Sequence, residues 1–186
     1  MRKVIYMMSM SLDGYIVDPD GGIDWSVPDP AIFQFFTDET RDLGAHLMGT
    51  RLYETMLYWE TVDPATLDDA DRDWVAVWNP LPKIVFSHSL TDLVGNARLA
   101  TEGVGEEIAR LRAEPGDGGI AIGGADLAAQ VAALDLIDEY QVIVYPVLLG
   151  GGRPYFVHDN RLVNLKLVET RTFDSGAVYL HYVVEH

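Results

Sequence analysis

The residues best suited to bind an anion lie at Ile120–Leu127, with the sequence IAIGGADL. A buried apolar strand here runs into two glycines and then directly into an amphipathic helix. Glycine lets the backbone approach an anion closely, and the free N–H groups at the start of the helix face that anion. The pattern suits the diphosphate of a dinucleotide. A tight strand-to-helix turn without any ligand accounts for it equally well.

A second junction of this kind lies at His46–Arg51, with the sequence HLMGTR. Gly49 opens the turn, Thr50 either caps the helix or binds phosphate, and Arg51 supplies a fixed positive charge or pairs with a surface carboxylate. A third strand ends just before Ser87, whose hydroxyl can donate a hydrogen bond. Because the carboxyl ends of parallel strands lie at one edge of a sheet, the three junctions together predict a composite dinucleotide site.

Other kinds of chemistry find little support. The chain has no cysteine, which excludes disulfides, thiolate metal sites and cysteine nucleophiles. Its five histidines show no metal-ligand spacing, so we predict no metal site. Asp18, Asp20 and Asp24 around Gly21 resemble a calcium loop only loosely, and a solvated loop is the better interpretation. A Rossmann fingerprint, a Walker A sequence and an esterase elbow are all missing.

The elements that would position these junctions alternate along the chain. Apolar runs with β-branched residues predict strands at 4–8, 45–48, 83–86, 119–122 and 140–145. Helical patterns begin near Pro30, Thr50, Val104 and Leu127, the last with an apolar stripe of Leu127, Val131 and Leu134. This alternation predicts an α/β fold with a mostly parallel central sheet flanked by helices.

The end of the chain departs from that rhythm. Two strand-like segments, 162–172 and 177–184, flank the turn at 173–176 and predict an antiparallel C-terminal hairpin. Proline and glycine mark loops at 18–30, 61–82, 113–119 and 146–154, none of which resembles a domain linker. We therefore expect residues 1–186 to form a single domain. Trp74 and Trp78 are expected in the core or at a dimer face.

The composition sets the expected partners and compartment. The chain has 29 acidic residues against 13 Lys and Arg, a net charge of −16, which disfavours nucleic acid as a partner. A phosphorylated cofactor stays possible because helix N-termini and single arginines act at short range. No apolar run is long enough to span a membrane, and no signal peptide is recognised. We expect a cytoplasmic protein that binds a small molecule and neither nucleic acid nor membrane.

Five motifs in order resemble those of a known family. Residues 4–16, which include the sequence SLDG, look like the first strand of the reductase domain of riboflavin biosynthesis proteins. Residues 22–25 resemble the tryptophan-bearing loop that this family shares with dihydrofolate reductase. Residues 48–51, 122–125 and 145–151 are similar to its second-strand turn, its glycine pair and its P-x-L-L-G-G loop. The resemblance spans essentially the whole chain and implies a dihydrofolate-reductase-like fold.

The resemblance implies an NADPH-dependent reductase that transfers hydride to a small imine or carbonyl, as in 5-amino-6-(5-phosphoribosylamino)uracil reductase. By the same resemblance, Met10 and Trp25 would line the nicotinamide, and the protein would be a homodimer. Their positions in the loops make Asp13 and Asp24 the nearest catalytic candidates. The peptide between the two glycines of the pair would be cis. The residues expected to hold the rest of the cofactor are Gly49, Thr50, Arg51, Ser87, Gly123, Gly124, Ala125, Asp126 and Leu127.

Departures from the family concern the substrate. Dihydrofolate reductases carry a buried carboxylate early in the first helix, whereas here only Asp29 is close and it is out of register. Ile122 replaces the acidic residue that often precedes the glycine pair, and Tyr15 replaces a basic residue after SLDG. A true dihydrofolate reductase is therefore the least favoured function. A non-catalytic nucleotide-binding protein on the same fold remains the main alternative to a reductase.

Overall fold

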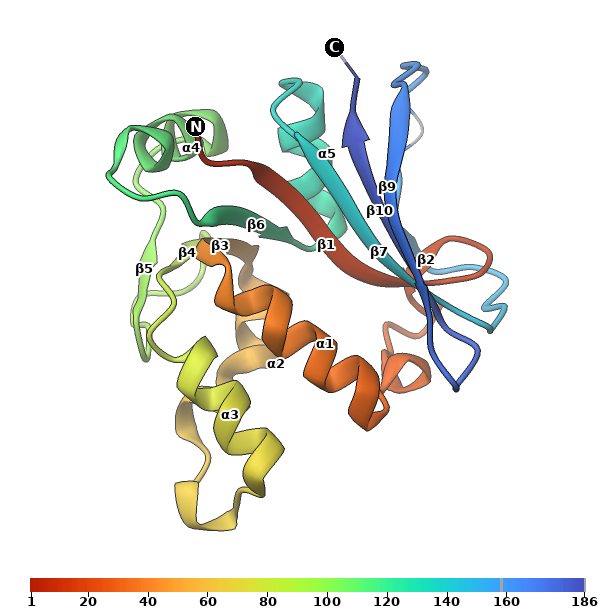
Figure 1. Ribbon diagram of the computed structural model, residues 1–186. Helices are drawn as coiled ribbons and strands as arrows, with labels where there is room; N and C mark the ends of the chain where they lie inside the picture. The colour runs from red at the N-terminus through yellow and green to blue at the C-terminus, as the bar shows by residue number, and fades with distance from the viewer. Residues whose placement is uncertain (158, 186) are drawn as a thin grey trace.

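The computed structural model describes residues 1–157 and 159–185 and contains a large mixed sheet (Figure 1). Its strands are β1 (Val4–Ser11), β3 (Leu43–Gly49), β4 (Lys83–Phe86), β5 (Ala97–Leu99), β6 (Gly119–Gly123), β7 (Glu139–Tyr145), β9 (Leu165–Thr172) and β10 (Val178–Val184). They lie side by side in the order β5-β4-β3-β6-β1-β7-β10-β9. A small separate sheet pairs β2 (Tyr15–Val17) with β8 (Arg153–Pro154).

Within the large sheet, only β10 runs opposite to the other strands. All pairs from β5 to β7 are parallel, whereas β10 pairs antiparallel with both β7 and β9. The predicted α/β fold, with a mostly parallel sheet and an antiparallel C-terminal hairpin, is thus confirmed. The two or three residues each of β2, β5 and β8 are too few to show a period, and we did not predict these strands.

Helices cover both faces of the sheet. They are α1 (Pro30–Arg41), α2 (Thr50–Thr61), α3 (Asp69–Trp78), α4 (Val104–Ala113) and α5 (Ala125–Ala133). Side chains of α4 and α5 share one apolar core with β1, β3 and β6. Side chains of α1, α2 and α3 pack in two further cores, against β7 with β10 and against β3 with β4. No described helix is long and apolar enough to cross a membrane.

The start of α1 forms as its sequence predicts. Asp29 is the N-cap, its Oδ1 accepts a hydrogen bond from the N–H of Ile32 at 2.9 Å, and Pro30 occupies the first helical turn. The stripe predicted on the helix at 127–134 is shorter than expected. The helix ends at Ala133, and Leu134 is 52 % exposed because it already belongs to the turn that follows.

The prediction of a loop at 61–82 was wrong, because α3 occupies its middle. Asp68 is the N-cap of α3 and accepts a hydrogen bond from the N–H of Asp71 at 2.9 Å. Trp74 and Trp78, one turn apart, are buried and stack with their ring centroids 5.3 Å apart. These aromatic contacts supply the packing energy that holds a short, acidic helix, so tertiary contacts outweigh the loop-like local composition.

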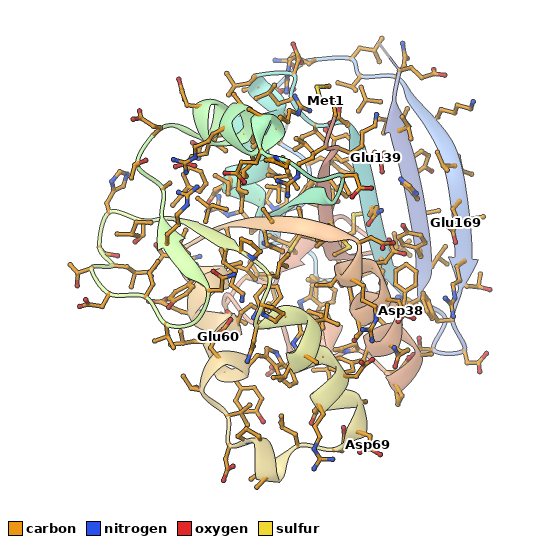
Figure 2. The ribbon with its side chains drawn as sticks, turned by 60° about the vertical axis from the view of Figure 1, so that its left-hand side comes forward. Met1, Asp38, Glu60, Asp69, Glu139 and Glu169 are labelled. Atoms are coloured by element: carbon orange, nitrogen blue, oxygen red, sulfur yellow. The ribbon has the colours of Figure 1, made fainter. Side chains whose placement is uncertain are left out.

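The acidic charge is spread over the outside of the molecule. Figure 2 shows the labelled carboxylates Asp38 on α1, Asp69 at the start of α3, and Glu139 and Glu169 on β7 and β9. Glu60 is an exception, because its buried carboxylate pairs with buried Lys83 at 2.6 Å. The labelled carboxylates thus come from several elements of the fold and do not gather at one site.

Candidate cofactor-binding site

A cavity of about 700 Å³ lies at the carboxyl ends of β3 and β6. It is bounded by the starts of α2 and α5, by Met8 on β1 and by Ile16 and Val17 on β2. The predicted cofactor-binding residues that line it are Gly49, Thr50, Arg51, Gly123, Gly124, Ala125, Asp126 and Leu127. The two junctions, at Gly49 and Gly123, are 74 residues apart in the sequence and share one cavity, as the parallel topology predicts.

The β3–α2 junction offers backbone and side-chain donors. Gly49, not Thr50, is the N-cap of α2 and has no side chain to satisfy the free N–H groups of the first turn. The Thr50 hydroxyl instead donates a hydrogen bond to Ser87 Oγ at 2.8 Å, and Ser87 Oγ also accepts from the N–H of Leu90. Ser87 lies outside the cavity lining but fixes Thr50 within it. Of the two options for Thr50, helix capping is excluded.

Arg51 is exposed at the edge of this cavity. Among the described residues, no carboxylate lies within ion-pair distance of its guanidinium. The alternative in which Arg51 pairs with a surface carboxylate therefore finds no support in this structure. Its charge is available to an anionic ligand.

The β6–α5 junction depends on two different properties of glycine. A Cβ at Gly123 would collide with Leu52 Cδ2 and would lie 2.7 Å from His46 Cε1. Gly124 has a φ of +92°, and nothing lies within 4 Å of where its Cβ would be. Gly123 is thus required by packing, whereas Gly124 opens space beside the cavity. The peptide joining them is not cis, so that expectation was wrong.

Several lining residues escaped the sequence analysis, and Arg153 is the most important of them for binding an anion. Arg153 on β8 lies at the cavity, and its Nη2 is 2.9 Å from Asp126 Oδ2 on α5. The signal for it in the sequence is that Arg153 lies two residues after the family-like loop at 145–151. Two arginines, Arg51 and Arg153, and two carboxylates, Glu54 and Asp126, therefore line the cavity.

Met10 and Trp25, which the resemblance placed at the nicotinamide, lie outside the cavity lining. Met10 packs with the core beneath α5, and Trp25 packs with the core beside α1. The Trp25 ring meets Tyr145 edge to face, with centroids 5.8 Å apart. Trp25 Nε1 is buried without a hydrogen-bond partner in the described part of the chain. The two predicted residues thus lie in different cores of the molecule.

The predicted catalytic aspartates also lie outside the cavity lining. Asp13 accepts hydrogen bonds from Ser11 Oγ at 2.6 Å, from Leu149 N at 3.1 Å and from Gly150 N at 2.7 Å. The hydrogen bond from Ser11, with those from the two backbone N–H groups, lowers the pKa of Asp13. These bonds join the β1–β2 turn to the loop that leads to Arg153. Asp24 is exposed in a short 3-10 helix.

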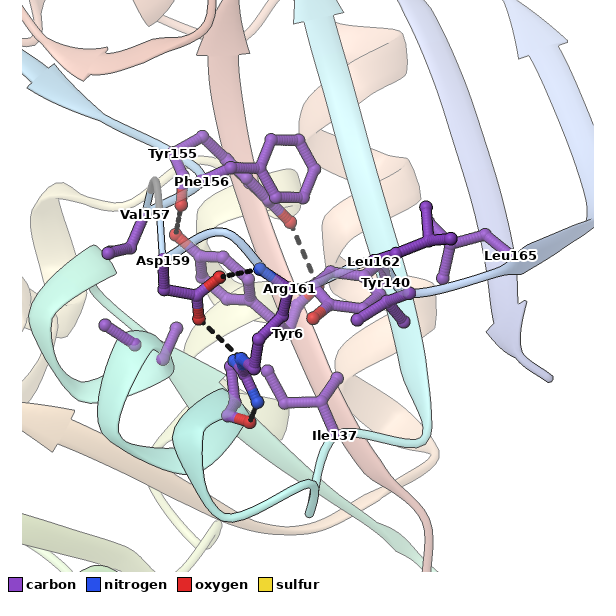
Figure 3. Close-up of a pocket in the computed structure, with 14 residues that line it drawn as sticks. Tyr6, Ile137, Tyr140, Tyr155, Phe156, Val157, Asp159, Arg161, Leu162 and Leu165 are labelled. Atoms are coloured by element: carbon purple, nitrogen blue, oxygen red, sulfur yellow. Dashed lines mark hydrogen bonds and ion pairs between the residues drawn. The ribbon is translucent and has the colours of Figure 1, made fainter. Parts of the chain in front are cut away.

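A second, smaller cavity of about 290 Å³ lies on the other side of α5, beneath the segment that follows β8. Figure 3 shows Tyr6, Tyr140, Tyr155 and Phe156 around it, with Asp159 and Arg161 paired at its rim. The Tyr6 and Tyr155 rings stack with centroids 4.2 Å apart. No glycine is among the described residues that line this cavity, and none of the predicted cofactor-binding residues lines it, so the larger cavity is the candidate site.

The comparison with protein families decides the classification, because the RibD C-terminal domain family matches residues 2–179. The chain belongs to this family. Two Bacillus subtilis (strain 168) relatives, the uncharacterized proteins YyaP and YwjB, are each 31 % identical over 97 % and 98 % of the chain and 94 % and 98 % of their own lengths.

Solved structures of this family share the fold. The Shewanella sp. PV-4 protein named "Putative riboflavin biosynthesis protein" aligns with a TM-score of 0.78 at 24 % identity, over 100 % of both chains. A Thermotoga maritima diaminohydroxyphosphoribosylaminopyrimidine deaminase/5-amino-6-(5-phosphoribosylamino)uracil reductase aligns with a TM-score of 0.66 at 17 % identity, over 99 % of this chain and 57 % of its own. The dihydrofolate-reductase-like fold expected from the motifs is therefore confirmed.

The hydrogen bonds to Asp13 generate a prediction about pH. A carboxyl with a lowered pKa in the folded state contributes stability above its unfolded pKa of about 3.9 and loses it as pH falls through the folded pKa. We expect Asp13→Asn to lower the melting temperature at pH 7, and the difference from wild type to shrink as pH falls below about 4. Thermal unfolding followed by circular dichroism across this range measures the effect.

Asp24→Asn is the matched control, because Asp24 is an exposed aspartate in the same segment between β1 and α1. It should leave the melting temperature unchanged at both ends of the range. If Asp13→Asn melts with the wild type at pH 7, the link between the β1–β2 turn and the 146–152 loop does not contribute to stability.

Proposed function

We propose that the protein is an NADPH-dependent reductase that transfers hydride to a small imine or carbonyl substrate, similar to 5-amino-6-(5-phosphoribosylamino)uracil reductase. One observation carries the proposal: two uncapped helix starts, at Gly49 and Gly124, open on the same cavity. Each presents free N–H groups and the positive end of a helix dipole. Its volume of about 700 Å³ lies within the usual range of cofactor sites.

The residues at the cavity fit NADPH at both of its phosphate groups. The open space at Gly124 receives the diphosphate, which the N–H groups of Ala125 and Asp126 approach because no Cβ intervenes. Arg51, at the other junction, is placed to bind the 2′-phosphate by charge-assisted hydrogen bonds. Bound NADPH supplies the hydride. The protein supplies orientation, a dry apolar wall that includes Met8 and Ile16, and compensation of the phosphate charge.

The substrate side supports a reductase other than dihydrofolate reductase. Asp29 is the acidic residue nearest to the folate-binding position, and its carboxylate caps α1. The hydrogen bond from Ile32 N lowers the pKa of Asp29. A pterin would find no free carboxylate there. Asp13 and Asp24 as proton donors stay a prediction, and the hydrogen bonds of Asp13 favour a positioning role for it.

NADPH binding is tested first and catalysis second. NADPH binding to the folded state alone should raise the melting temperature. A screen of small imines and carbonyls should then reveal NADPH oxidation. NADPH binding without oxidation of any substrate would favour the alternative of a non-catalytic nucleotide-binding protein. If millimolar NADPH leaves the melting temperature unchanged, the site assignment is wrong.

Arg51 generates a prediction about cofactor preference. Hydrogen bonds to charged groups contribute about 1.5–3 kcal/mol, so Arg51→Ala should raise the Kd of NADPH about 10-fold or more and change that of NADH little. Isothermal titration with both cofactors measures this. Arg72→Ala on α3 is the control, since Arg72 is also exposed but lies away from the cavity. Equal weakening of both cofactors would give Arg51 a structural role only.

The glycine pair generates a second binding prediction. Alanine at Gly124 meets no neighbouring atom but must adopt a φ near +92°, at a cost of about 1–3 kcal/mol. Gly124→Ala should therefore stay folded. Its methyl group would occupy the space proposed for the diphosphate, so the variant should lose most of its affinity for NADPH. Gly176→Ala is the control, because Gly176 has a similar φ of +86° in the remote β9–β10 turn. It should lose similar stability and keep NADPH binding. Wild-type affinity in Gly124→Ala would move the dinucleotide elsewhere.

We further propose that the protein is a homodimer joined at β9. This strand is the edge of the sheet, all of its residues are exposed, and Leu167 and Val168 are 49 % and 55 % exposed. Antiparallel pairing with a second copy about a two-fold axis at Leu167 would place Leu167 against Leu167 of the second copy and Lys166 against its Val168. Edge strands with apolar side chains favour such pairing.

Light scattering after gel filtration tests the dimer. We expect the wild type at twice the mass of one chain, and Leu167→Asp at or near the mass of one chain, because the two introduced carboxylates would lie opposite each other. Leu162→Asp is the control, since Leu162 is 90 % exposed but precedes the strand. A monomeric wild type, or a Leu167→Asp variant as dimeric as the control, would contradict the proposal.

A further inference from the structure

Arg153 is a charged residue at the cavity whose backbone is held firmly while its side chain is partly free. In the small sheet it pairs with Val17 of β2, and the next residue, Pro154, pairs with Tyr15. Gly152, just before it, has a φ of +119° and lies so close to the backbone of Val17 that a Cβ would collide there. The Arg153 side chain, by contrast, is 46 % exposed. Movement at this point is therefore confined to the side chain.

Asp126, the partner of Arg153, lies where the diphosphate is proposed to bind. It is the second residue of α5, whose N-cap Gly124 offers no side chain to the free N–H groups. A carboxylate in the first turn is itself favoured by the helix dipole. In the free protein Asp126 is thus the anion at the start of α5, and Arg153 neutralises it at 2.9 Å.

An incoming diphosphate would meet this carboxylate at close range. The repulsion falls if the Arg153 guanidinium turns from Asp126 to the phosphate oxygens. An exposed ion pair contributes little to stability, so it opens readily, whereas arginine binds phosphate with paired, charge-assisted hydrogen bonds. Asp126 is 71 % exposed at its side chain and can turn into solvent once released.

We propose that Arg153 is a diphosphate-binding residue, which Asp126 holds beside the site until the cofactor enters. The inference rests on the proposed function and deepens it by naming the group that binds the bridging phosphates. The two arginines would then bind different phosphates: Arg51, at the β3–α2 junction, the 2′-phosphate, and Arg153, beside the β6–α5 junction, the diphosphate. In a chain with a net charge of −16, each phosphate group thereby receives its own local cation.

A double-mutant cycle separates direct binding from mere neutralisation of Asp126. The variants are Arg153→Gln, Asp126→Asn and the combination of both, each titrated with NADPH and with inorganic pyrophosphate. Arg161→Gln is the control, since Arg161 also pairs with aspartates near α5 but lines the other cavity. Circular dichroism verifies that each variant is folded before titration.

We expect Arg153→Gln to raise the Kd of NADPH about 10-fold and Asp126→Asn to lower it a few-fold. The double variant should bind about 10-fold more weakly than Asp126→Asn, because the contact to phosphate is lost in either background. Pyrophosphate should show the same order, and the control should match the wild type. If the double variant binds as tightly as Asp126→Asn, Arg153 acts only on Asp126 and the proposal is overturned.

The pyrophosphate titration distinguishes this inference from the proposed function. Pyrophosphate binding that depends on Arg153, without NADPH binding by the wild type, would keep the anion site and reject the reductase. NADPH binding that is the same in wild type and Arg153→Gln would keep the cofactor site and reject the role of Arg153. Binding of neither ligand by the wild type would reject both.

Discussion

The absence of a side chain at Gly123 is the constraint on which the site depends. Leu52 at the start of α2 and His46 on β3 fill the space that a Cβ would need, so two helices and two strands meet around one backbone position. His46 is buried, and burial lowers its pKa to about 4, so the imidazole stays neutral in this contact. A Cβ at this position would require Leu52 and His46 to move, and both junctions, at Gly49 and at Gly124, line the same cavity.

A site for a phosphorylated ligand in so acidic a protein must rely on short-range groups. The carboxylates are spread over α1, α3, β7 and β9, and salt screens exposed charges over roughly 10 Å. Helix N-termini and two arginines, in contrast, act within hydrogen-bond distance of the ligand. The carboxylate of Asp126 is paired with Arg153, so the net negative charge at α5 is removed where it would matter most. Local geometry thereby overrides the net charge of the chain.

The strands and the glycine junctions could be predicted from sequence because their signals are local. Apolar β-branched runs identify β1, β3, β4, β6 and β7, and Asp29 with Pro30 identifies the start of α1. What could not be predicted depends on contacts between distant segments. Helix α3 lies in a proline- and aspartate-rich segment that looks like a loop, and the stacking of its tryptophans stabilises it. Arg153 is brought to the site by the pairing of β8 with β2. Met10 and Trp25 are close in sequence, yet the alternation of β1 and the path of the following loop place them in different cores.

The segment between β1 and α1 helps to explain a difference within the site. Its proposed substrate side follows the family pattern less closely than its proposed cofactor side does. On the proposed cofactor side, the candidate binding groups are backbone N–H groups at helix starts, which the topology of the sheet brings together. On the other side, three aspartates already serve the chain itself: Asp13 binds the N–H groups of Leu149 and Gly150, Asp18 those of Asp20 and Gly22, and Asp29 that of Ile32. The carboxylates of this segment are thus already engaged within the chain, whereas the starts of α2 and α5 keep backbone N–H groups without a side-chain cap at the cavity.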